Sequence, residues 1–167
     1  MEIRLALPTD LASVQGIEEA SDQVFASVMD VSLWGSAPTG QERATEPGFL
    51  LVAAEGDEVV GFAHVVDVDG PGGPAHLEQI AVLPDRSRRG VGSVLLEQAC
   101  RYAAERGFAQ VTLRTFRDVP WNAPFYAGHG FVVMADEPDW MGPLRAAEER
   151  IGLPRNGVRV AMVRPLT

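Results

Sequence analysis

The sequence contains no lysine, a single cysteine and no long hydrophobic run. Its 14 basic residues are all arginines, so a local group of arginines is a weaker sign of a binding site here than in an ordinary composition. The lone cysteine, Cys100, excludes an internal disulfide framework and a metal site built from several cysteines. The longest uncharged apolar run in mid-chain, residues 59–66, is far shorter than the ~20 residues of a transmembrane helix. We therefore expect no membrane span and no membrane partner.

The charge balance is strongly negative. The 23 acidic residues outnumber the 14 basic ones, and the formal net charge is −9. This balance argues against nucleic acid as a partner. It would attract a cationic substrate, but it is equally consistent with solubility alone. The opening residues, MEIRLALPTD, lack the basic segment and apolar stretch of a signal peptide, so we expect a cytoplasmic protein.

Length and composition fit one globular domain. The chain has 167 residues, of which 46% are apolar and 22% are charged, close to the averages for globular proteins. These values exclude an intrinsically disordered or collagen-like chain. Residues 1–167 contain no internal repeat and no linker composition, so we predict a single domain.

Hydrophobic periodicity and turn residues predict an alternation of strands and helices. Thr9 or Asp10 caps a first helical region, of one or two helices, that extends to Met29. The strongest helix lies between Gly90 and Gly107, because its apolar residues recur at the spacing of one helix face. The predicted strands are residues 2–7, 49–54, 59–66, 75–82, 109–115, 131–135 and 158–164; further helices begin near residue 122 and cover 142–152, and residues 35–48 form a loop.

Two predicted connections define the sheet. Residues 49–54 and 59–66 are separated by the four residues EGDE, which predicts a β-hairpin. Strand 75–82, helix 90–107 and strand 109–115 predict a right-handed crossover and a parallel pair of strands. The predicted fold class is therefore α/β, with a mixed sheet of the α+β kind.

The loop of residues 84–93 joins a predicted strand to the strongest predicted helix. Gly90 and Gly92 let the backbone approach a bulky anion, and the free amides of the first helical turn add partial positive charge. Together with Arg88 and Arg89 they form a candidate pyrophosphate cradle. The alternative, a glycine-assisted helix start with solvated arginines, stays open on these residues alone.

Two motifs resemble those of the GNAT N-acetyltransferase superfamily. Residues 76–84, HLEQIAVLP, followed by residues 88–92, RRGVG, resemble its motif A. Residues 122–131 follow the pattern N-x-x-x-Y-x-x-x-G-F and resemble its motif B. The longer run TFRDVPWNAPFY, residues 115–126, is similar to a bacterial subgroup of the superfamily. One departure is Ser87, which stands where the family usually has Gln or Arg, so a neighbouring arginine would have to replace that contact to the pyrophosphate.

The resemblance implies a fold and a cosubstrate. In the GNAT acyltransferase fold the fourth and fifth strands, here residues 75–82 and 109–115, splay apart after a β-bulge, and acetyl-CoA enters the gap. Its pantetheine arm then pairs with the backbone of Ile80 and Val82, since splayed edges leave backbone groups unpaired. The implied acetyl-CoA site consists of Ile80, Ala81, Val82, Arg88, Arg89, Gly90, Val91, Gly92, Ser93 and Asn122.

Three side chains are candidate catalytic groups. His76 and Glu78 are two residues apart on a strand, so both point to one face, where many GNAT enzymes carry a His or Glu. A lysine-like ammonium costs about 4.6 kcal/mol to deprotonate at pH 7 and an α-amine only about 1 kcal/mol, so a base matters mainly for the former. We expect Glu78 to be the base, assisted by His76. Tyr126 matches the family tyrosine that protonates the departing CoA thiolate.

Ordinary structural roles stay open for each of these residues. Glu78 is otherwise a solvated or arginine-paired carboxylate, and His76 a packed or surface histidine. Tyr126 is otherwise a core residue at helical spacing. Asn122 either hydrogen-bonds the pantetheine or caps the helix that follows it.

The sequence therefore predicts an enzyme, an acetyl-CoA-dependent N-acetyltransferase that moves acetyl to a small-molecule or peptide amine by direct attack. The alternative is a catalytically silent CoA-binding sensor or interaction module. No metal is expected, because His64 and His129 are too scattered for a metal site. The resemblance also allows a homodimer. Residues 20–48 and 136–156 would shape the acceptor pocket, with Phe25, Met29, Trp34 and Trp140 as candidate lining residues.

Overall fold

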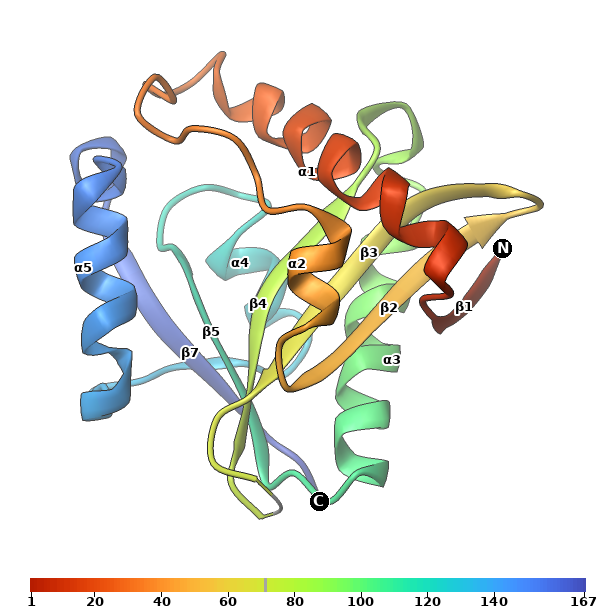
Figure 1. The fold of residues 1–167 in the computed structure, drawn as a ribbon. Coiled ribbons are helices and arrows are strands. Elements are labelled where there is room, and N and C mark those ends of the chain that lie inside the picture. Colours follow the sequence, from red (N-terminus) through yellow and green to blue (C-terminus); the bar gives the residue numbers. More distant parts are fainter. Residues whose placement is uncertain (71) are drawn as a thin grey trace.

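Seven strands form one mixed sheet in the computed structural model, which describes residues 1–70 and 72–167 (Figure 1). The strands are β1 (Glu2–Leu5), β2 (Gly48–Glu55), β3 (Glu58–Asp67), β4 (Pro74–Val82), β5 (Gln110–Phe116), β6 (Val132–Val133) and β7 (Arg159–Pro165). Their order across the sheet is β1-β2-β3-β4-β5-β7-β6. Only β4 and β5 run parallel within the described residues; the other neighbours are antiparallel. The predicted α/β class with a mixed sheet is confirmed.

Helices cover both faces of this sheet. The helices are α1 (Leu11–Phe25), α2 (Gly40–Ala44), α3 (Val91–Glu105), α4 (Ala123–Ala127) and α5 (Gly142–Arg150), with 3-10 turns at Pro8–Asp10, Pro84–Arg86, Asp139–Met141 and Leu153–Asn156. The first two lie over one face of the sheet and α3 over the other (Figure 1). Within residues 1–70 and 72–167, no helix combines the length and hydropathy that crossing a membrane requires.

Alternation along β2 divides the apolar core between the two faces. Leu51 belongs to the cluster that contains Leu95 and Leu96 of α3. Its neighbour Leu50 belongs to the separate cluster that contains Val14 of α1. Successive side chains of a strand point to opposite faces, so a strand covered on both sides is apolar almost throughout. This explains the continuous apolar runs of β2 and β3.

The predicted hairpin and the predicted parallel pair are both present. In the hairpin, Glu55 pairs with Glu58, so the turn consists of Gly56 and Asp57, and Gly56 has the positive φ of 61° that such tight turns need. The crossover through α3 returns the chain parallel to β4, as predicted.

The parallel pair is short, and this is the feature that makes the site. Pairing between β4 and β5 covers only residues 74–76 and 110–112, although β4 continues to Val82 and β5 to Phe116. On the other side of β4 the register against β3 shifts, because Leu77 pairs with Val65 and Gln79 with His64. Glu78 is therefore the extra residue of a β-bulge. The splay and the bulge implied by the resemblance are both found.

The start of α1 differs from the prediction. Neither Thr9 nor Asp10 caps the helix, which instead follows a 3-10 turn. The Asp10 carboxylate turns back to accept hydrogen bonds from the Leu7 amide (2.6 Å) and from Nη1 of Arg4 (2.6 Å). A charged partner on the neighbouring strand competes successfully with the cap, because hydrogen bonds between ionised groups are the stronger kind.

Two further predictions were wrong in detail, and one of the two roles left open for Asn122, the helix cap, is not found. The predicted loop 35–48 contains α2, whose start is capped by the Thr39 hydroxyl accepting from the Glu42 amide at 3.0 Å. Asn122 precedes α4 without a side-chain cap, since its amide oxygen accepts from β5 instead. The strand predicted at residues 131–135 shrinks to Val132–Val133, which lie at the exposed edge of the sheet.

The close approach of α1 and α2 yields a stability prediction. A Cβ on Gly40 would lie 2.2 Å from the backbone oxygen of Leu11, whereas a Cβ on Gly16, inside α1, would meet nothing within 4 Å. We expect Gly40→Ala to lower the free energy of unfolding by about 2 kcal/mol through overpacking. The matched variant Gly16→Ala should raise it by about 0.5–1 kcal/mol, because alanine favours the helix. Urea denaturation of both variants checks the pair, and equal effects would contradict the tight contact.

Candidate functional site

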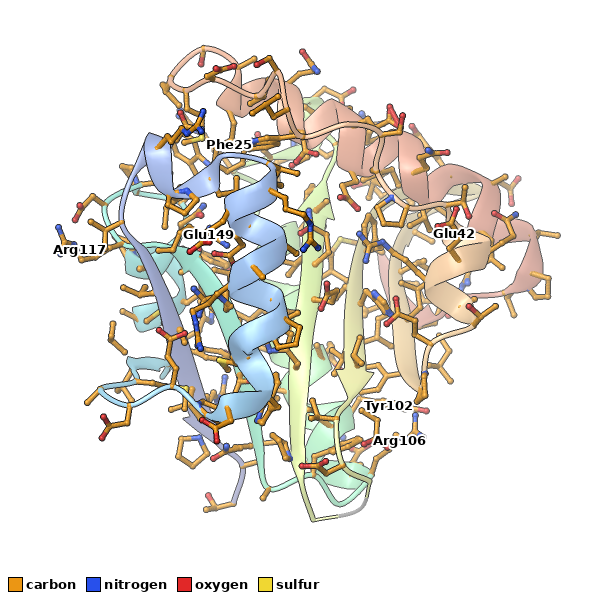
Figure 2. All side chains as sticks on the ribbon, turned by 60° about the vertical axis from the view of Figure 1, so that its left-hand side comes forward. Phe25, Glu42, Tyr102, Arg106, Arg117 and Glu149 are labelled. Atoms are coloured by element: carbon orange, nitrogen blue, oxygen red, sulfur yellow. The ribbon has the colours of Figure 1, made fainter. Side chains whose placement is uncertain are left out.

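A cavity of about 1030 Å³ opens where β4 and β5 diverge. One wall comes from α1 and the loop that follows it, and the opposite wall comes from α5 and the turn after it. Figure 2 shows α5 standing in front of the strands, with Phe25 near the end at which α5 finishes. Residues of β4, the start of α3 and α4 line the remaining sides. The cavity therefore joins the two regions that the sequence assigned to the cosubstrate and to the acceptor.

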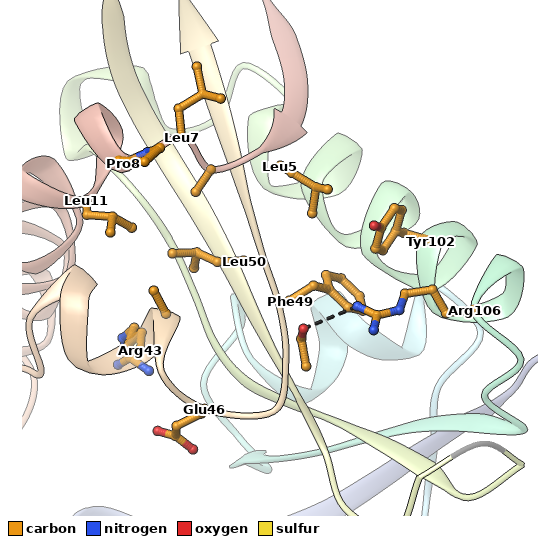
Figure 3. A pocket seen from close by; sticks show the side chains of 13 residues that line it. Leu5, Leu7, Pro8, Leu11, Arg43, Glu46, Phe49, Leu50, Tyr102 and Arg106 are labelled. Atoms are coloured by element: carbon orange, nitrogen blue, oxygen red, sulfur yellow. Dashed lines mark hydrogen bonds between the residues drawn. The ribbon is translucent and has the colours of Figure 1, made fainter.

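A second hollow of about 370 Å³ lies between the start of α1, β2 and α3 (Figure 3). Leucines and Phe49 supply much of its lining, and Arg106 lies over Phe49 and donates to the Gly48 carbonyl at 3.2 Å. These contacts are packing contacts, and we assign no chemistry to this hollow.

The start of α3 has the geometry expected of an anion cradle. Gly90 has a φ of 81°, and Arg88, two residues before it, also has a positive φ of 61°. Gly92 lines the cavity, and a Cβ there would meet only the side chains of Phe125 and Val82, both at 3.9 Å. The bare backbone of α3's first turn is thus open to the cavity, where its free amides and the helix dipole favour an anion.

Most of the predicted acetyl-CoA residues meet at this cavity. Arg89 and Val91 are the exceptions among the predicted set: neither lines the cavity, and the Val91 side chain is buried in the core. Those that line it are Ile80, Ala81, Val82, Arg88, Gly90, Gly92, Ser93 and Asn122.

The β4 edge facing the cavity is unpaired. After His76, no residue of β4 pairs with β5 in the described part of the chain, so the backbone groups of Ile80 and Val82 on that side have no strand partner. Buried backbone groups need hydrogen-bond partners. A bound amide-rich arm is one way to supply them, which is the role that the resemblance implies for this segment.

His76 is buried and its protonation state follows from its contacts. We assign the ring proton to Nδ1, because the Thr112 hydroxyl can donate its one proton to the Ala75 carbonyl at 3.4 Å and then accept from Nδ1 of His76 at 2.9 Å. The other ring nitrogen, Nε2, therefore carries a lone pair. Burial, with a smaller contribution from the positive charge of Arg114, lowers the pKa of His76 to about 4, so the ring is neutral at physiological pH.

Glu78 faces that lone pair. Its Oε2 lies 3.9 Å from Nε2 of His76, and 37% of its side-chain surface is accessible. Partial desolvation raises the pKa of Glu78, and repulsion from Glu46 adds to the rise. The two predicted acid–base residues are thus neighbours, and both nitrogen and oxygen are acceptors that need a donor between them.

Tyr126 lines the cavity beside the α3 start. Its ring packs edge-on against Phe125 and Phe131, with centroids 5.2 Å and 5.9 Å away. Burial raises the pKa of its phenol well above the ordinary value, so the hydroxyl is a proton donor. Asn122 anchors α4, because its Oδ1 accepts from the Thr115 hydroxyl at 2.8 Å and the Phe116 amide at 3.3 Å.

Sequence reasoning missed two ion-pair networks in the cavity walls. Glu148 on α5 accepts from Nε of Arg114 (2.8 Å) and from Nε of Arg159 (3.0 Å). Burial opposes its charge, but these arginines together hold the pKa of Glu148 below its usual range. On the other wall, Glu18 accepts from Nη2 of Arg43 at 2.5 Å. No local motif marks these residues, since their partners are 11 to 34 positions away in the sequence: Arg159 (11), Arg43 (25) and Arg114 (34).

Two of the four candidate lining residues of the acceptor pocket line the cavity, and two do not. Phe25 and Trp34 line the cavity and pack together at 5.6 Å, and Trp121 packs on Phe25 at the same distance. Trp140 lies behind His76, edge-on at 5.4 Å, rather than in the lining. Met29, the fourth candidate, is likewise not a lining residue.

Comparison with known proteins agrees with this geometry. Residues 17–131 match the sequence profile of the Acetyltransferase (GNAT) family. Mycothiol acetyltransferase of Clavibacter sepedonicus is 40% identical over 82 residues, 49% of this chain and 25% of that protein. Streptothricin acetyltransferase A of Bacillus subtilis (strain 168) is 41% identical over 64 residues, 38% of this chain and 36% of that protein. The matches thus span about a quarter to a third of these relatives.

Solved structures share the fold. Aminoglycoside 6'-acetyltransferase type Ii superposes with a TM-score of 0.69 at 17% identity, over 100% of this chain and 98% of that one. The ribosomal-protein-S18-alanine N-acetyltransferase from Escherichia coli gives 0.64 at 21% identity, over 99% and 94%. At these identities the likeness concerns the fold alone. The expectation that residues 115–126 mark a bacterial subgroup stays a prediction.

The His76 contacts yield a spectroscopic prediction. In a nitrogen-15 NMR titration we expect His76 to stay neutral, with its proton on Nδ1, from pH 8 down to about 5, and to protonate at about pH 4. Because this pKa lies below the unfolded value of ~6.5, the associated stability is complete above that value and is lost as pH falls toward 4. Thr112→Val removes the acceptor for Nδ1 and should mix the two tautomers. Titration of the ring near pH 6.5 would contradict the assignment.

Proposed function

Because this chain belongs to the Acetyltransferase (GNAT) family, we propose that it transfers an acetyl group from acetyl-CoA to an amine by direct attack of the amine nitrogen. The observation that carries the proposal is the meeting of a glycine-bare helix start, an unpaired β4 edge and the His76–Glu78 pair in one cavity. The acceptor is a small molecule or a peptide amine; the relatives named for mycothiol and streptothricin support the small-molecule kind.

The proposed cosubstrate fits the residues that are present. The pantetheine arm lies along the free edge of β4, where Ile80 and Val82 offer backbone groups, and the pyrophosphate lies on the amides from Arg88 to Ser93. A branched side chain at Gly92 would fill the cradle. The thioester supplies the acetyl group, and the Val82 amide polarises its carbonyl oxygen.

The acid–base roles follow from protonation states. The ammonium of the acceptor donates to Nε2 of His76 and to the Glu78 carboxylate, which are both acceptors 3.9 Å apart. Glu78 takes one proton, directly or through water, and the nitrogen lone pair then forms the new bond to the acetyl carbon as the carbon–sulfur bond breaks. The acylated nitrogen loses its second proton to water, which leaves a neutral amide. The Tyr126 hydroxyl hydrogen-bonds or protonates the departing thiolate. No covalent enzyme intermediate is needed.

Release of free CoA thiol tests the proposal. The full chain is incubated with acetyl-CoA and a panel of amines, with CoA binding measured separately. Thiol release that depends on an amine supports the enzyme. Tight CoA binding without acceptor-dependent release across a broad panel would favour the silent sensor instead. A single domain spanning residues 1–167, a cytoplasmic location and a homodimer are further expectations, which gel filtration and localisation would test.

The cradle predicts the effect of Gly92→Val. The branched side chain would crowd the pyrophosphate and stiffen the first turn of α3, so we expect acetyl-CoA to bind about tenfold more weakly or worse. The matched control is Ala104→Val, which places the same side chain on an exposed position of the same helix. Calorimetry with CoA measures both. An unchanged dissociation constant in folded Gly92→Val would remove the cradle from this turn.

The base predicts a pH-dependent defect in Glu78→Gln. At neutral pH the variant should have a lower kcat/KM than the wild type. The loss corresponds to an increase in activation free energy of up to several kcal/mol for a lysine-like amine and of about 1 kcal/mol for an α-amine. Rising pH supplies neutral amine from solution, so the variant should approach the wild type near the pKa of the acceptor. His76→Gln should show a smaller defect of the same shape. A Glu78→Gln defect that is constant from pH 6 to 10 would instead indicate that the carboxylate binds substrate.

A further inference from the structure

The cavity contains a carboxyl that the proposed chemistry does not use. Asp22 lines the cavity from α1, one helical turn after Glu18, and is half-buried. It has no hydrogen-bond or ion-pair partner among residues 1–70 and 72–167. Burial raises the pKa of Asp22 to about 7, with repulsion from Glu18 and Glu19 adding to the rise. A cation placed beside such a carboxyl would stabilise its ionised form.

Most of the other charged side chains that line the cavity already form ion pairs with each other. Glu18 is paired with Arg43, and Glu148 is paired with Arg114 and Arg159. Among residues 1–70 and 72–167, Arg88 at the cradle and the exposed Arg150 are the cations of the lining that pair with no carboxylate, and the cradle is where an anion is expected. This leaves two carboxyls without an arginine contact, Asp22 and Glu78.

A second observation concerns the Glu78 end of the cavity, where two acceptors face each other. The His76 side chain is only 6% exposed, lines the cavity and has its Nδ1 engaged by Thr112. Its Nε2 lies 3.9 Å from Oε2 of Glu78, and no side chain among residues 1–70 and 72–167 donates a hydrogen bond to it. Two acceptors facing each other 3.9 Å apart call for an N–H group between them. A single protonated amine satisfies this pair but leaves Asp22 unmatched.

The surface beside Asp22 suits an apolar chain that ends in a cation. Phe25 follows Asp22 by three residues and so lies on the same face of α1. It packs against Trp34 and Trp121, with centroids 5.6 Å away in each case. Aromatic faces cover methylene groups and attract alkylammonium ions. The labelled Phe25 in Figure 2 marks this end of the cavity, close to the end of α5.

We propose that the acceptor is a diamine or a larger polyamine, whose reacting nitrogen meets Glu78 and His76 while a second ammonium is held by Asp22. The inference rests on the proposed function and names its substrate class. Phe25 and Trp34, which also line the cavity, offer aromatic surface to the methylenes of such a molecule. A monoamine of the same length lacks the second ion pair, and an amino acid would bring its carboxylate toward Asp22.

The test compares cadaverine with pentylamine, which differ by one terminal amine. Acetyl-CoA-dependent thiol release by the full chain at constant pH gives kcat/KM for each, and calorimetry in the presence of CoA gives their affinities. We expect cadaverine to be favoured by about tenfold or more, the size of one charge-assisted hydrogen bond. In Asp22→Asn the ratio of the two values should fall about tenfold, through the KM for cadaverine. The matched control Glu19→Gln removes a charge from an exposed neighbour on α1 that acts on Asp22 only through repulsion, so it should change the ratio much less than Asp22→Asn does.

The outcomes separate the two proposals. Equal values for cadaverine and pentylamine, or a ratio that Asp22→Asn leaves unchanged, would overturn the second-amine site while thiol release still supports the transferase. If the ratio falls as much in Glu19→Gln as in Asp22→Asn, the preference for cadaverine comes from the general negative charge of α1. This outcome would overturn a specific contact between Asp22 and the second ammonium. Asp22-dependent binding of cadaverine without thiol release from any amine would overturn the proposed function and support the diamine site.

Discussion

The short pairing of β4 with β5 is the constraint on which the site depends. Three residue pairs hold the strands together at one end, and beyond them the bulge at Glu78 turns β4 away from its neighbour. The same divergence leaves a free β4 edge, opens the cavity and brings the bulged residue to its surface. A fully paired parallel sheet would satisfy its own backbone and would have no room for a cosubstrate between these strands.

Ion pairs between distant elements hold the walls on either side of this gap. Glu148 joins α5 to β5 and β7 through Arg114 and Arg159, and Glu18 joins α1 to α2 through Arg43. These groups are largely buried, so removal of one partner would leave an uncompensated charge at a cost of about 3–5 kcal/mol. These ion pairs therefore mainly fix the positions of the cavity walls. They add little net stability, because burial of both charges is itself unfavourable.

The sequence predicts the part of the site that is local in the chain. The cradle at residues 88–93, the His76–Glu78 pair and Tyr126 lie on short segments whose spacing and flanking glycines indicate their geometry. Glu18, Arg43, Arg114 and Glu148 were not predictable in this way, because their roles arise from pairing between elements far apart in the sequence. The error at Asp10 and the missing cap at Asn122 have the same origin: a residue suited to cap a helix instead bonds to a neighbouring strand.

Binding an amine and deprotonating it make opposite demands on the cavity. A carboxylate that attracts an ammonium also stabilises its charged form, which raises the amine's pKa and opposes loss of the proton. The raised pKa of Glu78 eases this conflict at the reacting nitrogen, because each unit by which it approaches the amine's pKa lowers the cost of transfer by about 1.4 kcal/mol. Neutral His76 adds a hydrogen bond without adding a charge. In the proposed diamine site, Asp22 on α1 attracts the second ammonium, whereas Glu78 on β4 takes the proton from the first. Binding and proton removal are therefore assigned to different carboxyls.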